Sequence, residues 1–315
     1  MSQLNTDEIQ PISVEDYTKE DGILFRYVLS KKEELAIADI IYTVLYGTSA
    51  VAKGEFKFFT SEESCKYALQ TIRELVPNLV AALDKYFSSI GKTKHFIRLS
   101  TLSPKDAYPV LKYNKFHHQL KQIAYEDRHE EESEPMISAS ELHEELQFLC
   151  VSNTDDCLRL LTHSYRTFID LSSGVKENNA VLLLPWKGDD FWYESETRVC
   201  VKNGRVRAMS EYYTDVQGGY ANVPSLTTTD AVSIYGQRII AFVEQLVTFS
   251  ATPKTIIADV ALSKSGEIHF IEYNAYDPGT FDTCLFEDSD EIDNLKCIEF
   301  RWRDTDNKVI VHKLL

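Results

Sequence analysis

The segment "DVALSKSGEIHFIEYN", residues 259–274, is typical of a β-hairpin that turns at Ser265-Gly266. Counting back from a two-residue turn places Asp259 opposite Glu272, and it also gives the facing pairs Leu262–His269 and Val260–Ile271. Two carboxylates that face each other across a hairpin repel unless a positive charge lies between them. The pattern therefore indicates a positive group at this end of the hairpin.

Asn274 lies two residues beyond Glu272, so both side chains are expected on one face of the hairpin. With Asp259 they form a set of three oxygen donors, which is the kind of ligand that a hard cation such as Mg²⁺ takes. Mg²⁺ held in this way commonly bridges substrate phosphates, so the set also implies a nucleotide. In the alternative interpretation, Glu272 points to solvent and Asn274 only begins a turn.

An earlier hairpin, "ETRVCVKNGRVRAMSEYY" at residues 196–213, turns at Asn203-Gly204, the preferred sequence for a two-residue turn. The same counting gives the facing pairs Lys202–Arg205, Cys200–Arg207 and Arg198–Met209. One face is expected to be basic, with Arg198, Lys202, Arg205 and Arg207, and the other apolar, with Val199, Val201, Val206 and Ala208. Basic residues near the turn can simply face solvent. Arg198, far from the turn, is the candidate for a phosphate contact.

The composition and net charge limit the kinds of molecule that the protein can bind. The chain of 315 residues has a net charge of −16, which argues against nucleic acid or an anionic membrane as its main partner. No apolar run approaches the roughly 18 residues of a membrane helix, and the polar N-terminus lacks the features of a signal peptide. Six cysteines without a close CxxC pair suit reduced thiols. These features predict a cytoplasmic protein.

Apolar periodicity and turn signals predict helices followed by antiparallel hairpins, which favours a two-lobed α+β fold. The expected helices span residues 31–50, 60–90 with a bend near Pro77, 140–150, 155–164 and 229–250, and the expected strands span 95–100 and 180–188. The predicted division is a helical N-terminal region 1–92, a first lobe 93–180 with an acidic loop at about 126–135, and a second lobe 181–315 that carries the site.

Three blocks of sequence resemble the cell division cycle protein 123 family. They are "HFIRLSTLSPKDAY" (95–108), "ETRVCVKNGRVRAMSEYYT" (196–214) and "DVALSKSGEIHFIEYNAYDPGTFDTCLF" (259–286), in the order that the family has them. The resemblance implies an ATP-grasp fold with antiparallel sheets flanked by helices, and binding of ATP with Mg²⁺. It also implies a role as an assembly chaperone for eukaryotic translation initiation factor two, through the gamma subunit of that factor.

The resemblance also implies roles for single residues. Arg98 would approach the nucleotide phosphates, and the strand from Leu182 to Lys187 would be the hinge between lobes, where adenine binds. The implied nucleotide contacts are Arg98, Leu184, Trp186, Lys187, Arg198 and Ser210, and the implied metal ligands are Asp259, Glu272 and Asn274.

Several departures point to a diverged member of the family. Glu272 replaces an aspartate, Ala275 replaces a proline, and Glu211 stands where glutamine is usual. The family's N-terminal segment with a tryptophan is not found before residue 90. Glutamate keeps the ligand chemistry of aspartate, so the metal set survives the first change.

Two other functions remain open at this point. The protein could be an ATP-grasp ligase that activates a carboxylate as an acyl-phosphate, with Asp277 or Asp282 in "AYDPGTFDT" as a base, although this segment also suits a plain turn. It could also be a scaffold with a decayed site. The resemblance favours the chaperone. Alanine at Asp259 or Glu272 is expected to abolish Mg²⁺-dependent ATP binding and to leave the fold intact.

Overall fold

The computed structural model describes residues 23–46, 48–50, 55–57, 61–100, 102–113, 136–173, 179–249, 253–276 and 282–314. The expected acidic loop and Asp277 lie outside these ranges. The chain forms two compact units. The first unit comprises Ser13–Glu132 and Glu145–Trp186, and the second unit comprises Met1–Ile12, Ser133–Glu144 and Lys187–Leu315. The mixture of helices and mainly antiparallel strands confirms the α+β class, and the predicted lobe boundaries stay a prediction.

The first unit is built around a four-stranded antiparallel sheet in the order β1-β6-β4-β5. Its strands are β1 (Phe25–Val28), β6 (Ala180–Pro185), β4 (His95–Leu99) and β5 (Cys150–Val151), and a separate ribbon pairs β2 (Thr48–Ala50) with β3 (Glu55–Lys57). Its helices are α2 (Lys31–Tyr46), α3 (Ser61–Leu75), α4 (Pro77–Ile90), α5 (Ala107–Tyr113), α8 (Thr154–Thr162) and α9 (Tyr165–Ser172). The helix α7 (Ala139–Gln147) crosses from the second unit into the first.

The long helix expected over residues 60–90 is divided at its proline. Pro77 is the first residue of α4, where its missing N–H costs nothing because that group has no partner in a helix. Helix α3 therefore ends at Leu75, before the proline. Gly91 ends α4 with a φ of 72°, a conformation that glycine adopts more easily than other residues.

Part of the first sequence block has a structural role at the start of α9, a helix that the sequence analysis missed. Ser164 caps this helix by accepting a hydrogen bond from the Thr167 N–H at 3.0 Å. Asp106 accepts hydrogen bonds from Ser164 Oγ at 2.6 Å and from the Arg166 N–H at 3.0 Å. The aspartate of "SPKDA" therefore holds the N-terminus of α9, and it accepts a hydrogen bond from a backbone N–H that has no partner within the helix.

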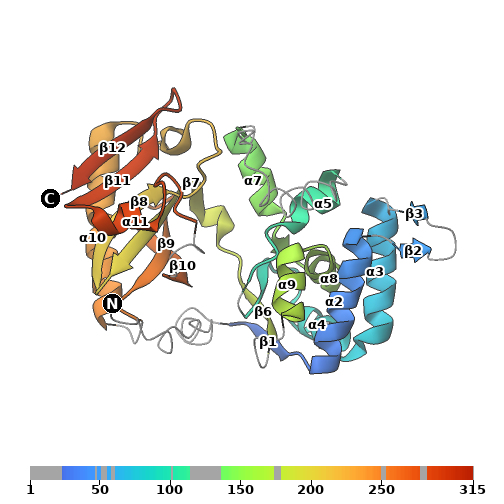
Figure 1. The fold of residues 1–315 in the computed structure, drawn as a ribbon. Helices are drawn as coiled ribbons and strands as arrows, with labels where there is room; N and C mark the ends of the chain where they lie inside the picture. The colour runs from blue at the N-terminus through green and yellow to red at the C-terminus, as the bar shows by residue number, and fades with distance from the viewer. Residues whose placement is uncertain are drawn as a thin grey trace, which may run out of the picture. The chain divides into compact units, whose positions relative to one another are not determined.

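The second unit contains a six-stranded sheet in the order β10-β9-β7-β8-β11-β12. Among the described residues, β8 and β11 pair in parallel, and the other neighbouring strands pair antiparallel. The strands are β7 (Phe191–Lys202), β8 (Arg205–Glu211), β9 (Ile256–Ser263), β10 (Ile268–Ala275), β11 (Ile298–Arg303) and β12 (Val309–Leu314). Two short 3₁₀ helices lie in its loops, η2 (Gly188–Asp190) and η3 (Gly219–Asn222). Helix α10 (Thr229–Phe249) covers one face of the sheet, and the short α11 (Ser289–Asn294) lies on the other (Figure 1).

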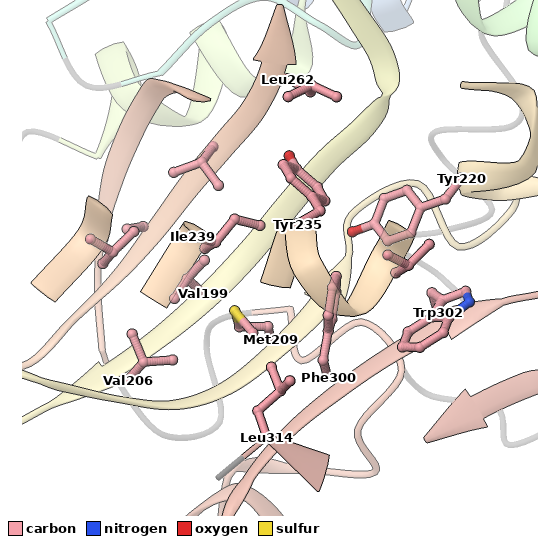
Figure 2. Packing of buried hydrophobic residues seen from close by; sticks show 14 of the residues in the cluster. Val199, Val206, Met209, Tyr220, Tyr235, Ile239, Leu262, Phe300, Trp302 and Leu314 are labelled. Carbon is pink, nitrogen blue, oxygen red and sulfur yellow. The ribbon is translucent and has the colours of Figure 1, made fainter. Parts of the chain in front are cut away.

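Helix α10 supplies one wall of the hydrophobic core of the second unit. Its buried residues recur every three or four positions, as Val232, Tyr235, Ile239, Val243 and Val247. They pack against the apolar face of the sheet, which is shown in Figure 2 with Val199, Val206, Met209, Leu262, Phe300 and Leu314. None of the described helices combines the length and the apolar composition that crossing a membrane requires.

Gly236 marks a close approach between α10 and the sheet. A Cβ at this position would lie 2.6 Å from Phe300 Cδ1, and Phe300 is fully buried in the core. Alanine normally favours a helix over glycine by about 1 kcal/mol, but overpacking a core costs roughly 1–3 kcal/mol. We expect Gly236→Ala to lower the free energy of unfolding in urea. Gln237→Ala, at an exposed position of the same helix, is the control, and a gain in stability for Gly236→Ala would contradict the packing.

Candidate functional site

A row of polar residues crosses five adjacent strands of the second unit. Arg198 faces Asp259 on one side and Ser210 on the other, Asp259 faces Glu272, and Ser210 faces Arg301. Residues that face each other in register project to the same face of a sheet. We call Glu272, Asp259, Arg198, Ser210 and Arg301 the polar row. Because alternate residues of these strands build the core with α10, the row lies on the opposite face.

The register of the β9–β10 hairpin differs from the prediction near the turn but agrees with it at the site. The predicted pairs Leu262–His269 and Val260–Ile271 are wrong by one residue, and the observed pairs are Leu262–Ile268 and Val260–Phe270. The register shifts between Phe270 and Glu272, so one extra residue is absorbed there. Asp259 therefore faces Glu272, as predicted.

A second irregularity corrects the register of the β7–β8 hairpin. Lys202 faces Arg205 as predicted, but the register shifts between Cys200 and Val201. Beyond the shift the predicted pairs are wrong, and the observed ones are Cys200–Ala208, Val199–Met209 and Arg198–Ser210. Ala208 consequently packs on the face of the polar row, and Met209 takes the place in the core that was expected for Ala208.

Arg198 is the positive group beside Asp259. Its Nε donates to Oδ1 and its Nη2 donates to Oδ2, each at 2.9 Å, and the two side chains are 8% and 0% exposed. A third donor, Nη1, reaches the carbonyl oxygen of Asp282 at 3.1 Å, and the guanidinium lies 4.6 Å from the ring centroid of Tyr212. Arginine suits this place because its planar fork matches both carboxylate oxygens.

The charge of this pair is maintained despite its burial. Burial by itself would lower the pKa of Arg198, but the charge and hydrogen bonds of Asp259 outweigh burial and raise that pKa above its ordinary range. The guanidinium therefore stays protonated. A buried carboxylate and a buried guanidinium balance each other, so this pair carries no net charge.

The side chains expected to hold Mg²⁺ lie next to one another on β9 and β10. Asn274 Nδ2 donates to Asp259 Oδ2 at 3.2 Å, and Glu272 faces Asp259 in register. Among the described residues, no group of three or more His, Cys, Asp or Glu side chains is arranged to hold a metal ion. Two carboxylates and one amide still have the chemistry that a hard cation takes, so the residues fit Mg²⁺ provided that Asp259 releases Arg198.

Ser210 fixes the segment that leads into α11. Its Oγ donates to the Glu211 carbonyl at 2.9 Å and accepts from the Leu285 N–H at 3.2 Å. Downstream, Phe286 and Ile292 pack on Cys200, Ala208 and Ile257 beside the polar row, and that apolar cluster is completed by Tyr276. The segment therefore packs beside one side of the row.

Arg301 is the member of the row that sequence reasoning missed. Its Nη2 lies 2.6 Å from Glu291 Oε1 and 2.8 Å from Glu299 Oε2, and its guanidinium lies 4.0 Å from the ring centroid of Phe286. Its Nη1 donates to the Leu285 carbonyl at 3.2 Å. Arg301 thus ties the segment that leads into α11 to the sheet. The alternation of basic residues in "RWR" was the one sequence signal that pointed to Arg301, and it did not indicate which acidic residues Arg301 pairs with.

No protein-family model and no curated protein sequence matches this chain. Among solved structures, that of Cdc123 from Schizosaccharomyces pombe matches with a TM-score of 0.54 and 15% sequence identity, over 92% of this chain and 94% of that chain. A C-terminally truncated Cdc123 from the same organism matches with a TM-score of 0.53, the same identity and the same coverage. The chain has the fold of Cdc123. The resemblance drawn from the three sequence blocks is therefore confirmed at the level of the fold.

Arg98, the first of the nucleotide contacts that the Cdc123 family implies, belongs to the first unit. It lies on β4, faces Leu182 of β6, and is largely buried. Its Nε donates to the carbonyl of Leu99 at 3.2 Å. A buried basic residue on this strand is compatible with the implied phosphate contact, which stays a prediction.

The expected hinge residues lie where the chain leaves the first unit of this Cdc123-like fold. Leu184 sits on β6 opposite Phe96, and the Trp186 N–H donates to the Lys94 carbonyl at 3.2 Å, which extends the strand pairing. Trp186 is the last residue of the first unit, and Lys187 begins the last segment of the second unit just before η2. Their proposed contacts with adenine stay predictions.

Asp282, a candidate base in the ligase interpretation, already has a local partner. Its Oδ1 accepts a hydrogen bond from the Cys284 N–H at 2.8 Å, and its carbonyl accepts from Arg198. Cys284 has a φ of 56°, as a residue in a tight turn can have. The carboxylate thus stabilises this turn, whereas Pro278-Gly279, where the plain turn was expected, lies outside the described residues.

Proposed function

We propose that this protein binds ATP with Mg²⁺ on the polar row, and that it acts in this state as an assembly chaperone. The observation that carries the proposal is the buried Arg198, held beside Asp259 on one sheet face of a strongly acidic chain. Buried charges of this kind are costly and cluster at functional sites. The Cdc123 fold, inferred from sequence and found in the structure, supports the same function.

Each residue has a definite task in this proposal. Arg198 binds the phosphate chain, since a guanidinium can hold two phosphate oxygens at once. Asp259, Glu272 and Asn274 hold Mg²⁺, which neutralises phosphate charge when it is bound. The remaining nucleotide contacts would come from Arg98, Leu184, Trp186, Lys187 and Ser210.

The proposed partner is a protein, the gamma subunit of eukaryotic translation initiation factor two. This choice rests on the resemblance to the Cdc123 family. The net charge of −16 suits a basic protein surface better than nucleic acid, and a cytoplasmic location agrees with such a partner.

Calorimetric titration of ATP and Mg²⁺ into the full chain tests this function. We expect one ATP per chain, and we expect Glu272→Gln to weaken binding by about tenfold or more, because a neutral amide is a poorer ligand for Mg²⁺ than a carboxylate. Glu272 is only partly buried, so this variant should fold.

Glu244→Gln is the matched control, since Glu244 is paired with the exposed Arg205 on the same unit. Absence of binding, or equal affinity in wild type and Glu272→Gln, would overturn the proposed site. Steady release of ADP during a long incubation would favour the ligase over the chaperone.

A further inference from the structure

The phosphate-binding group of the proposed site is already engaged by one of the proposed metal ligands. Arg198 uses Nε and Nη2 on the two oxygens of Asp259, both at 2.9 Å, and Nη1 on the carbonyl of Asp282. The pairing of β7 with β9 places these two side chains opposite each other, so the contact belongs to the sheet itself.

This arrangement affects each ligand when it arrives alone. A phosphate chain that approaches Arg198 meets a carboxylate in the same buried contact, and the pair offers it little net attraction. A divalent cation that approaches Asp259 meets a guanidinium, and Asn274 presents its amide N–H to the same carboxylate. In either case one buried charge would be left without its partner, which is strongly unfavourable.

The two ligands together remove this obstacle. A cation can replace the guanidinium at Asp259 while the phosphate chain replaces the carboxylate at Arg198, so every buried charge keeps an opposite charge nearby. We propose that Asp259 and Arg198 are built-in competitors for the two ligands, so that triphosphate and divalent cation bind only together, by exchange of ion-pair partners. This inference rests on the proposed function, and it adds obligate coupling between nucleotide and metal.

Coupling of this kind is reciprocal, so it can be measured from both sides. In wild type we expect ATP in EDTA, and inorganic tripolyphosphate in EDTA, to bind much more weakly than ATP with Mg²⁺. Asp259→Asn removes the internal competitor and keeps the shape of the side chain. We expect this variant to bind metal-free ATP and tripolyphosphate about tenfold or more tighter than wild type does, although a metal ligand has been lost.

The reciprocal variant is Arg198→Gln, which frees the carboxylate of Asp259. We expect it to bind Mn²⁺ without nucleotide more tightly than wild type, by about tenfold or more in electron paramagnetic resonance titrations. Either variant alone carries the test if the other fails to fold. Arg205→Gln and Glu244→Gln open the exposed pair on the same unit, and they should change neither measurement.

The outcomes separate this inference from the proposed function. If wild type binds Mg²⁺ with ATP, but neither variant gains affinity for its single ligand, the exchange is overturned and the nucleotide site stands. Equal binding of ATP by wild type with and without Mg²⁺ would overturn the exchange and the proposed Mg²⁺ ligands, and would leave the nucleotide site. If no form binds ATP under any condition, both proposals fail.

Discussion

Replacing Asp259 with alanine is expected to lower the free energy of unfolding by about 3–5 kcal/mol, because it leaves a buried guanidinium without its counter-charge. Arg198 cannot lose its proton under ordinary conditions, so the cost cannot be avoided by neutralisation. The sequence alone predicted that this substitution leaves the fold intact, and the burial of the pair argues against that for Asp259. Glu272, which is only partly buried, is the better position for a binding defect without a loss of stability.

Urea unfolding of a double-mutant cycle measures this effect. Arg198→Met combined with Asp259→Ala should recover part of the loss, since an apolar side chain can replace a buried ion pair at little net cost. The exposed pair Arg205–Glu244 gives the comparison, and its coupling should be under about 1 kcal/mol. If the two losses at Arg198 and Asp259 simply add, the buried pair does not contribute as described.

Replacing Glu211 with glutamine is expected to stabilise the protein increasingly as the pH rises. Glu211 is buried in the second unit, where Oε1 accepts a hydrogen bond from the Arg303 N–H at 3.0 Å. Oε2 has no hydrogen-bond partner among the described residues, and a Cβ on Gly219 would clash with it. Burial raises the pKa of this carboxyl from 4.5 to about 8, and the Arg303 hydrogen bond and charge offset it only in part.

The sign follows from the raised pKa. The folded protein keeps this proton between about pH 4.5 and about pH 8, where the unfolded chain has released it, so the stability contributed by Glu211 falls across this window. Glutamine stays neutral throughout. The stability of Glu211→Gln relative to wild type should therefore rise across the window, by an amount on the order of 5 kcal/mol.

Urea unfolding at about pH 5 and about pH 8.5 tests this pH dependence. Glu62→Gln, which removes an exposed carboxylate from α3, is the control for the loss of one negative charge. A difference between Glu211→Gln and wild type that stays constant with pH would show that the carboxyl is ionised in the folded protein.

Local patterns predicted many of the elements of this fold, although they missed α9, and they predicted the pairing at the end of one hairpin. The Asn203-Gly204 turn and the Ser265-Gly266 turn placed β7 with β8 and β9 with β10, and they brought Asp259 opposite Glu272. Such signals lie within a few residues along the chain. They cannot reveal an irregularity inside a strand, and two of these shifted the register between turn and site.

The partner of Asp259 could not be predicted from the sequence, because it comes from a pairing between distant segments. Arg198 reaches Asp259 only through the contact of β7 with β9, and Arg301 joins the row only through the parallel pairing of β8 with β11. No turn signal fixes either pairing. The sequence therefore predicted the chemical groups of the site, and only the fold shows which of them are in contact.

A crystal structure of the full chain with ATP and Mn²⁺ tests the central claim most directly, because anomalous scattering locates the metal without interpretation. We expect one Mn²⁺ bounded by Asp259, Glu272 and Asn274, and the phosphate chain on an Arg198 that has left Asp259. A nucleotide bound elsewhere, with the ion pair between Arg198 and Asp259 intact, would contradict the proposed site.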